Sequence, residues 1–376
     1  MFLTVPALAQ KKQHYSLKWD VVAELPADSG LQNSLGVAGP VTGIHKDVLF
    51  VGGGANFPEA MPWQGGAKKF HTAIHVYAAK GRKLKLLAKS FSLPYPVAYA
   101  ASCNTATGIL YAGGESEKGI TDKVWLMMWD TKTEELLFKT LPALPFPVSN
   151  ASATLIGNTV YLAGGETAIN TSAQFHSLDL NDIFAGWNKL ADIPQPVSHT
   201  VMTHSSGKKG DKIYLCGGRK KNSNGISTLY NNVFEYDVAA NSWKEKKAMP
   251  YALSAGTGIM YDEKNILLFG GDKGIVFNKT ETLIATINTE KNPDKKHELV
   301  QQKNKFQTEH PGFSKEVLLY NCKRDTWEIV GSIPFDTPVT TTAIKLKSSV
   351  IIPSGEIKAG VRSPKILSVK IQRKKK

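Results

Sequence analysis

The chain has 376 residues, of which 42% are hydrophobic, and it contains 32 glycines and 19 prolines. This composition excludes a disordered or coiled-coil protein and favours a globular fold with many short strands and tight turns. The formal net charge of +14 comes from small clusters spread along the chain. These clusters lack the basic and aromatic alternation that binds nucleic acid, so we expect no nucleic-acid partner.

The N-terminal residues 1–13 resemble the end of a secretory signal peptide whose basic beginning is missing. Residues 2–10 form a short apolar run that ends in an Ala-x-Ala pattern at Ala7 and Ala9. We therefore expect a periplasmic or secreted protein. No other segment approaches the roughly 20 apolar residues that a membrane helix needs, so we expect no membrane span. Residues 373–376 form a basic tail.

Between these ends, residues 14–372 repeat one pattern six times. In each copy an apolar, β-branched run is followed by small residues, and the second glycine falls at Gly53, Gly114, Gly165, Gly218, Gly271 and Gly355. A period near ~50 residues is typical of kelch repeats, each of which forms one four-stranded blade. The sequence therefore predicts a single all-β domain, a six-bladed kelch-type β-propeller.

Tryptophan strands that end in proline complete several repeats, at residues 187–194, 243–250 and 327–334. The chain opens with such a strand around Trp19, with no repeat before it. It ends with a strand at residues 366–371 that has no tryptophan strand after it. We expect these two strands to pair, so that the N-terminal strand closes the last blade and removes an open sheet edge.

One repeat is longer than the others because of an insertion at about residues 273–316. The stretch is polar, with helix-like runs at residues 281–287 and 296–306 separated by Asn292 and Pro293. Long insertions in compact repeats are usually functional or disordered. We expect a partly helical insertion in blade five that covers one mouth of the channel.

The cysteines and histidines do not predict a metal site or a disulfide framework. Cys103, Cys216 and Cys322 are far apart and form no Cys-x-x-Cys pair. A copper radical oxidase of similar architecture would need two tyrosines, two histidines and a cysteine-linked tyrosine. The scattered histidines, His71, His75, His199 and His204, form no such set. We predict no metal and no cofactor.

The residues that follow the glycine pairs are predicted to share one mouth of the channel. They are Gly54, Glu115, Glu166, Arg219, Asp272 and Glu356. Four carboxylates and one arginine would make a polar pocket of the kind that binds small ligands. For each residue taken alone, a salt bridge or hydrogen bond to a neighbouring blade is an equally simple role.

The most informative segment is residues 354–363. Glu356 ends an inner strand, and Arg362 follows after Gly360, which allows the loop to turn. A carboxylate can transfer protons, whereas a guanidinium binds a planar carboxylate through two parallel hydrogen bonds. The pair suits an acidic sugar.

This segment resembles the Gly-Glu-x-x-x-Gly-x-Arg segment of the N-acetylneuraminate epimerases, the bacterial sialic acid mutarotases. Residues 36–39, 51–57 and 109–115 resemble the same family. In the familiar members the Gly-Glu…Arg segment lies mid-chain, whereas here it lies near the C-terminus. The chain therefore resembles a cyclically permuted branch of that family.

The resemblance implies a periplasmic six-bladed propeller that interconverts the anomers of a small acidic sugar without a metal or cofactor. It implies that Glu356 transfers the proton and that Arg362 binds the substrate carboxylate, with Glu115 as a second acid. Asn56 and Arg219 are further candidates for substrate contacts, although turn capping and a surface ion pair explain them equally well. A non-catalytic propeller that binds a glycan or a protein partner remains the alternative.

Overall fold

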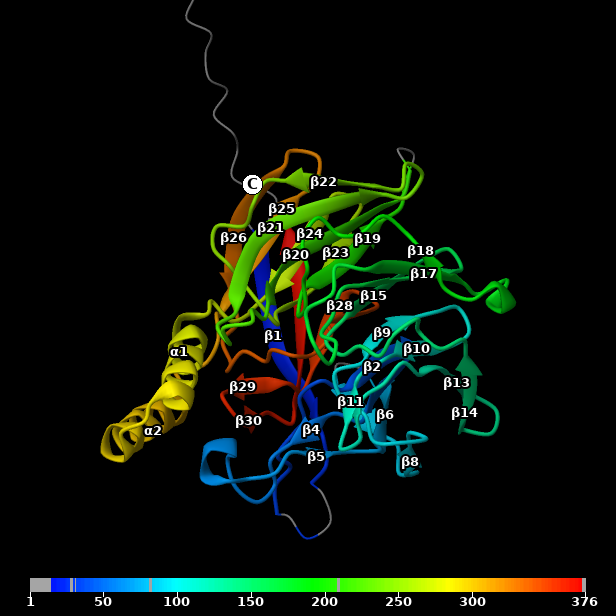
Figure 1. Ribbon diagram of the computed structural model, residues 1–376. Helices are drawn as coiled ribbons and strands as arrows, with labels where there is room; N and C mark the ends of the chain where they lie inside the picture. Colours follow the sequence, from blue (N-terminus) through cyan, green and yellow to red (C-terminus); the bar gives the residue numbers. More distant parts are fainter. Residues whose placement is uncertain (1–14, 28–29, 31, 81–82, 208–209, 374–376) are drawn as a thin grey trace, which may run out of the picture.

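The computed structural model describes residues 15–27, 30, 32–80, 83–207 and 210–373 (Figure 1). The expected signal-peptide remnant at residues 1–13 and the tail residues 374–376 lie outside the described residues. Of the helices that are described, none has both the length and the apolar character needed to cross a membrane.

The predicted six-bladed β-propeller is confirmed. Each blade is an antiparallel sheet whose strands run outward from the channel. Blade one contains β2 (Val41–His45), β3 (Val48–Gly52), β6 (Ala73–Lys80), β7 (Lys83–Leu86) and β8 (Phe91–Ser92). Blade two contains β9 (Ala101–Asn104), β10 (Ile109–Ala112), β13 (Val124–Asp130) and β14 (Glu135–Leu141). Blade three contains β15 (Ser152–Ile156), β16 (Thr159–Ala163), β17 (Phe175–Asp179) and β18 (Asn188–Lys189).

The remaining blades follow the same order from the channel outward. Blade four contains β19 (Val201–Ser205), β20 (Lys212–Lys220), β21 (Thr228–Asp237) and β22 (Ser242–Lys246). Blade five contains β23 (Thr257–Asp262), β24 (Asn265–Phe269), β25 (Glu316–Asn321) and β26 (Thr326–Ser332). Blade six contains β27 (Ile344–Leu346), β28 (Ser349–Pro353), β31 (Lys365–Arg373) and β1 (Tyr15–Glu24).

The N-terminal strand closes blade six, as predicted. β1 pairs antiparallel with β31 along its whole length, from Tyr15 opposite Arg373 to Glu24 opposite Lys365. In the same sheet, Trp19 lies opposite Val369 and packs edge-on against Phe269 of blade five, with ring centroids 6.0 Å apart. Both chain ends therefore contribute to the core between the last two blades.

Tryptophan side chains join neighbouring blades in the outer part of the propeller. The indole Nε1–H of Trp187 donates to the carbonyl of Pro142, that of Trp243 to Ala191, and that of Trp327 to Lys247. Each bond reaches back to the chain that connects to the same blade from the preceding one. The buried indole thus finds the hydrogen-bond partner that its polar edge requires.

A closed ring of main-chain hydrogen bonds surrounds the channel where the six blades meet. One residue just before each innermost strand donates its N–H to the carbonyl of the equivalent residue in the preceding blade, over 2.7–3.1 Å. The six residues are Gly39, Tyr99, Asn150, His199, Ala255 and Thr340, and all have positive φ. Gly39 has no alternative, because a Cβ there would lie 2.4 Å from the Tyr99 ring.

Three two-stranded hairpins extend from this end of the blades. They are β4 (Ala55–Asn56) with β5 (Lys69–Phe70), β11 (Glu115–Ser116) with β12 (Gly119–Ile120), and β29 (Glu356–Lys358) with β30 (Val361–Arg362). Short 3₁₀ turns occur at Pro62–Gln64 and Ile183–Ala185.

The pairing at this end corrects one predicted position. Ala55 pairs with Ala38 as Glu115 pairs with Ala98, and Gly54 donates to Val97 as Gly114 donates to Val148. The blade-one equivalent of Glu115 is therefore the fully buried Ala55 and not Gly54. The expectation was one residue early because three consecutive glycines left the register open.

The insertion in blade five forms two helices between β24 and β25. They are α1 (Ile275–Thr289) and α2 (Pro293–Thr308), which stand out from the body of the propeller (Figure 1). Asn292 caps α2 by accepting hydrogen bonds from the N–H groups of Asp294 and Lys295, and Pro293 occupies the first turn. The two expected helical runs are therefore present, each longer than predicted.

Candidate active site

A cavity of about 500 Å³ lies at the mouth of the channel beside the main-chain ring. Its polar wall includes five of the residues predicted to meet there, namely Glu115, Glu166, Arg219, Asp272 and Glu356, together with Arg362. The ring residues Tyr99, Asn150 and His199 also line it. The size is typical of a pocket for a small organic ligand.

The β29–β30 hairpin explains the spacing of Glu356 and Arg362. The two residues are cross-strand partners, and Gly360 forms the turn between them with φ of 70°. The Gly360 N–H donates to Glu356 Oε1 over 2.9 Å, while Glu356 Oε2 lies 3.9 Å from Arg362 Nη2. The hairpin thus fixes one carboxylate oxygen and turns the other towards the guanidinium.

Arg362 is buried but its donors are not fully used. Its side chain is 4% exposed, and the guanidinium lies over the Phe57 ring at 4.7 Å. Within the described part of the chain, Nε and Nη1 have no hydrogen-bond partner. A buried guanidinium with free donors at a cavity wall is ready to bind an anion, because leaving those donors unpaired is costly.

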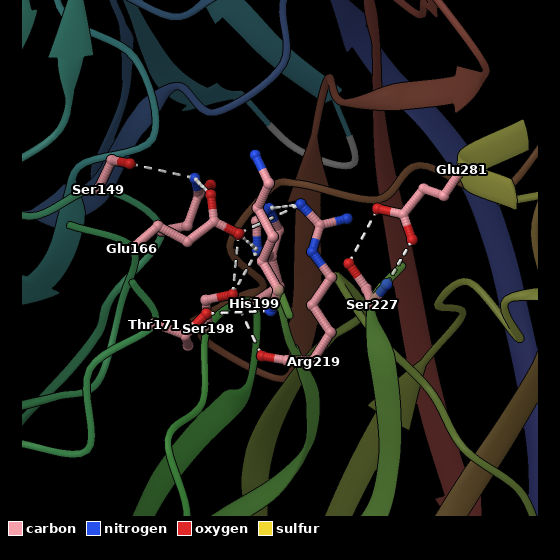
Figure 2. A network of polar contacts seen from close by, with 10 residues as sticks. Ser149, Glu166, Thr171, Ser198, His199, Arg219, Ser227 and Glu281 are labelled. Carbon is pink, nitrogen blue, oxygen red and sulfur yellow. Dashed lines mark hydrogen bonds and ion pairs between the residues drawn. The ribbon is translucent and has the colours of Figure 1, made fainter. Parts of the chain in front are cut away.

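Arg219 is held in a different way, in a network with Glu166 and His199 (Figure 2). Its Nη2 lies 3.3 Å from Glu166 Oε1 and 3.4 Å from His199 Nε2. Ser198 Oγ donates to the same Glu166 oxygen over 3.0 Å. Arg219 is therefore part of the cavity wall, with its charge already paired.

This network sets the ionisation of its members. Burial, together with the Arg219 charge, lowers the pKa of His199 to about 3, so its imidazole is neutral at physiological pH. Burial alone would raise the pKa of Glu166, but His199, Arg219 and the Ser198 hydroxyl outweigh it and lower the pKa. Glu166 is thus a fixed anion.

Glu115 also has a cationic partner. Lys68, in the loop before β5, forms an ion pair with Glu115 and lies over the Tyr99 ring at 5.2 Å. Burial opposes the charge of Lys68, but Tyr99 and Glu115 outweigh it and raise the lysine pKa. Neither Lys68 nor Tyr99 was predicted, because neither follows a glycine pair.

On the side of the inserted segment, Asp272 and His310 face the same cavity. Burial raises the pKa of Asp272, although its Oδ1 accepts the Gly274 N–H over 2.7 Å. Burial lowers the pKa of His310. His310 follows α2 directly and was not predicted, since no repeat pattern extends into the insertion.

Helix α1 is attached to the cavity wall by two side chains. Glu281 accepts hydrogen bonds from the N–H and the Oγ–H of Ser227, over 2.6 and 2.9 Å (Figure 2). Phe277 lies over the Arg219 guanidinium at 4.7 Å. The insertion therefore forms a wall of the cavity, in part an apolar one to which Phe277 and Ile284 contribute.

The structure does not place Asn56 in the cavity. Its side chain is buried, with Nδ2 donating to the Gly36 carbonyl over 2.9 Å and Oδ1 lying 2.9 Å from His71 Nε2. The predicted substrate contact is therefore wrong, because Asn56 joins the β4 strand to a neighbouring loop. Across the described ranges, no group of three or more His, Cys, Asp or Glu residues is arranged to hold a metal ion.

Comparison with known proteins places this architecture among related chains. The sequence profile described as N-acetylneuraminate epimerase matches residues 141–376. The N-acetylneuraminate epimerase of Brucella melitensis is 27% identical over 238 residues, which are 61% of this chain and 59% of that protein. That of Haemophilus influenzae is 29% identical over 231 residues, 60% of this chain and 58% of its own length.

The sequence match thus spans less than two thirds of these relatives. The likeness in fold is wider, because the solved structure of YjhT covers 95% of this chain and 100% of its own, with a TM-score of 0.64 and 14% identity. The profile begins at residue 141, the last residue of β14, so it covers blades three to six. The chain belongs to the N-acetylneuraminate epimerase family.

Proposed function

We propose that this protein is a mutarotase that interconverts the α and β anomers of N-acetylneuraminate or a related acidic sugar. The observation that supports this most directly is the buried Arg362 guanidinium, with free donors beside the Glu356 carboxylate at a cavity wall. The names of the relatives support the same substrate class.

Substrate binding is assigned to Arg362. The sugar carboxylate takes up the free Nε and Nη1 donors, and the Phe57 ring beneath holds the guanidinium plane in place. Lys68 and Arg219 are less suited to this role because Glu115 and Glu166 already neutralise them. A planar, two-pronged contact fixes the orientation of the sugar as well as its affinity.

Proton transfer is assigned to Glu356. Its carboxylate accepts the proton of the anomeric hydroxyl, the bond between the anomeric carbon and the ring oxygen breaks, and the electrons of the former O–H bond complete a carbonyl. The ring oxygen then receives a proton, and closure on the other face of the carbonyl gives the second anomer. A single positioned carboxylate can serve both transfers.

The test is to follow freshly released α-N-acetylneuraminate by proton NMR with wild type and Glu356→Gln. We expect the variant to lose about 100-fold or more of the catalysed rate, since it keeps the shape and loses the base. Glu263→Gln, an exposed position near the opposite end of the channel, is the matched control and should equal wild type. A Glu356→Gln variant as fast as wild type would contradict the assignment, and a wild type that binds the sugar without accelerating its mutarotation would identify a binding module.

A further inference from the structure

The inserted segment brings one histidine to the reacting end of the cavity. His310 follows the C-terminus of α2, is 7% exposed, and lines the cavity together with Asp272 and Glu356. The charged groups that act on its imidazole are Asp272, Glu356 and Lys358, from the chain after β24 and from β29. The insertion therefore does more than cover the channel mouth.

A hydrogen bond fixes the tautomer of this histidine. The Gly312 N–H donates to His310 Nδ1 over 3.0 Å, so Nδ1 must carry a lone pair and the neutral ring must carry its proton on Nε2. The Phe313 ring packs against the imidazole with centroids 5.0 Å apart and holds its orientation. Burial lowers the pKa of His310, which keeps the ring neutral.

The Nε2–H group remains available. No hydrogen-bond partner for it occurs in the ranges that the structure describes, whereas His199, the other histidine of the cavity, has Ser198 near Nδ1 and Arg219 near Nε2. A neutral imidazole fixed in this way is a hydrogen-bond donor and does not accept a proton at Nε2. Such a donor stabilises an oxygen on which negative charge develops.

We propose that His310 donates a hydrogen bond from Nε2–H to the ring oxygen of the sugar as that oxygen departs from the anomeric carbon, while Glu356 moves the proton. The inference rests on the proposed function. When the carbon–oxygen bond breaks, its electron pair stays on the ring oxygen, which the His310 donor stabilises until a proton arrives. His310 itself neither gains nor loses a proton during the cycle.

Two near-isosteric variants separate this role from a purely structural one. His310→Gln places an amide N–H close to the position of Nε2 but removes the Nδ1 acceptor. His310→Asn places an amide oxygen close to Nδ1, retaining the bond from Gly312, but removes the Nε2 donor. His310→Phe removes both groups.

Removal of one donor to a developing oxyanion typically lowers kcat by 10²–10³. We expect His310→Asn and His310→Phe to lose about 100-fold in kcat with little change in KM, and His310→Gln to remain at least about tenfold faster than His310→Asn. His297→Gln, an exposed position on α2, is the matched control and should equal wild type. Thermal unfolding of each variant identifies any that fail to fold.

The opposite order would overturn the proposal. If His310→Asn equals wild type while His310→Gln is slow, His310 only holds the Gly312 loop. If both are equally slow, the ring carries a proton and is not a fixed donor. Nitrogen NMR of wild type provides a reading independent of turnover, and we expect the Nε2–H tautomer, with an Nε2 shift that moves when the sugar binds.

These outcomes are distinguishable from failure of the proposed function. A wild type without mutarotase activity removes the function itself, whatever the variants show. A fully active wild type with an unaffected His310→Asn removes only the role of His310.

Discussion

At the scale of single residues, the cations of the cavity differ in whether a carboxylate already neutralises them. Lys68 and Arg219 form close ion pairs, whereas Arg362 Nη2 lies 3.9 Å from Glu356 and two further donor atoms have no partner in the described chain. The charge that is available to a ligand is therefore concentrated at one position.

We predict that Arg362→Lys raises KM by about 10–100-fold with a smaller effect on kcat. The lysine retains the positive charge but not the planar fork, and hydrogen bonds to charged groups contribute about 1.5–3 kcal/mol. The measurement is initial-rate NMR over a range of sugar concentrations. An unchanged KM would show that the carboxylate binds elsewhere.

His199 predicts a pH dependence of stability. Its folded-state pKa is about 3, whereas an unfolded histidine titrates near 6.5. Between these values the unfolded chain binds a proton that the folded chain does not, so stability falls as pH is lowered through this window by about 1.4 kcal/mol per unit. Because other buried histidines add with the same sign, the useful quantity is the difference between wild type and His199→Gln.

That difference is measured by denaturant unfolding between pH 4 and about pH 7. The His199→Gln curve should be flatter by about 1.4 kcal/mol per pH unit below 6.5. Parallel curves would mean that His199 is protonated in the folded protein, as an ion pair with Glu166.

At the scale of elements, the inserted helices depend on few contacts with the propeller. The two hydrogen bonds from Ser227 to Glu281 and the stacking of Phe277 on Arg219 join α1 to blade four. The exposed polar surface of α2 contributes little to holding the pair in place.

We therefore predict that Glu281→Ala loosens the insertion without unfolding the blades. Hydrogen exchange should accelerate across residues 275–310 while the melting temperature changes little, since the lost bonds are local and worth about 1.5–3 kcal/mol. Catalytic efficiency should fall severalfold, because His310 is carried by the same segment. The exposed Glu298→Ala on α2 is the control, and equal exchange in both variants would argue against the anchor.

The repeated elements were predictable from sequence, because apolar runs followed by glycine recur with a period that only blades explain. The hairpin partnership of Glu356 and Arg362 follows from the turn that Gly360 permits. The position of Ala55 was missed, because adjacent glycines give no register. His310 was missed for a different reason, since its placement depends on how a non-repeated insertion folds back over the channel.

At the scale of the whole molecule, the limited sequence match has a topological explanation. The profile begins at the boundary between blades two and three, whereas the structural likeness extends over nearly the whole chain. A cyclic permutation of the blade order would produce this contrast, because an alignment in chain order recovers only one side of the permutation point. The permutation remains a prediction.

The paired ends provide an experiment. Tyr15 lies opposite Arg373, so a short hairpin linker can join them while new termini are opened between β14 and β15. We predict that this permutant folds and retains mutarotase activity, with at most about 2 kcal/mol lost because loop closure changes little. Circular dichroism and the NMR assay report the outcome.

Deletion of residues 1–24 gives the contrasting variant. It removes β1 and leaves β31 with an open edge, so we expect aggregation and loss of activity together. A soluble, active deletion variant would show that β1 is dispensable for closure.

The main-chain ring around the channel has a consequence for how this protein can evolve. Its six bonds join backbone atoms alone, so they do not specify which side chains stand on them. Tyr99, Asn150, His199, Ala255 and Thr340 differ widely in size and polarity, yet all accept the left-handed conformation, at a cost of roughly 1–2 kcal/mol each. Replacements at these positions change the lining of the cavity while the scaffold beneath it stays in register, which leaves substrate preference open to change by single mutations everywhere on the ring except Gly39.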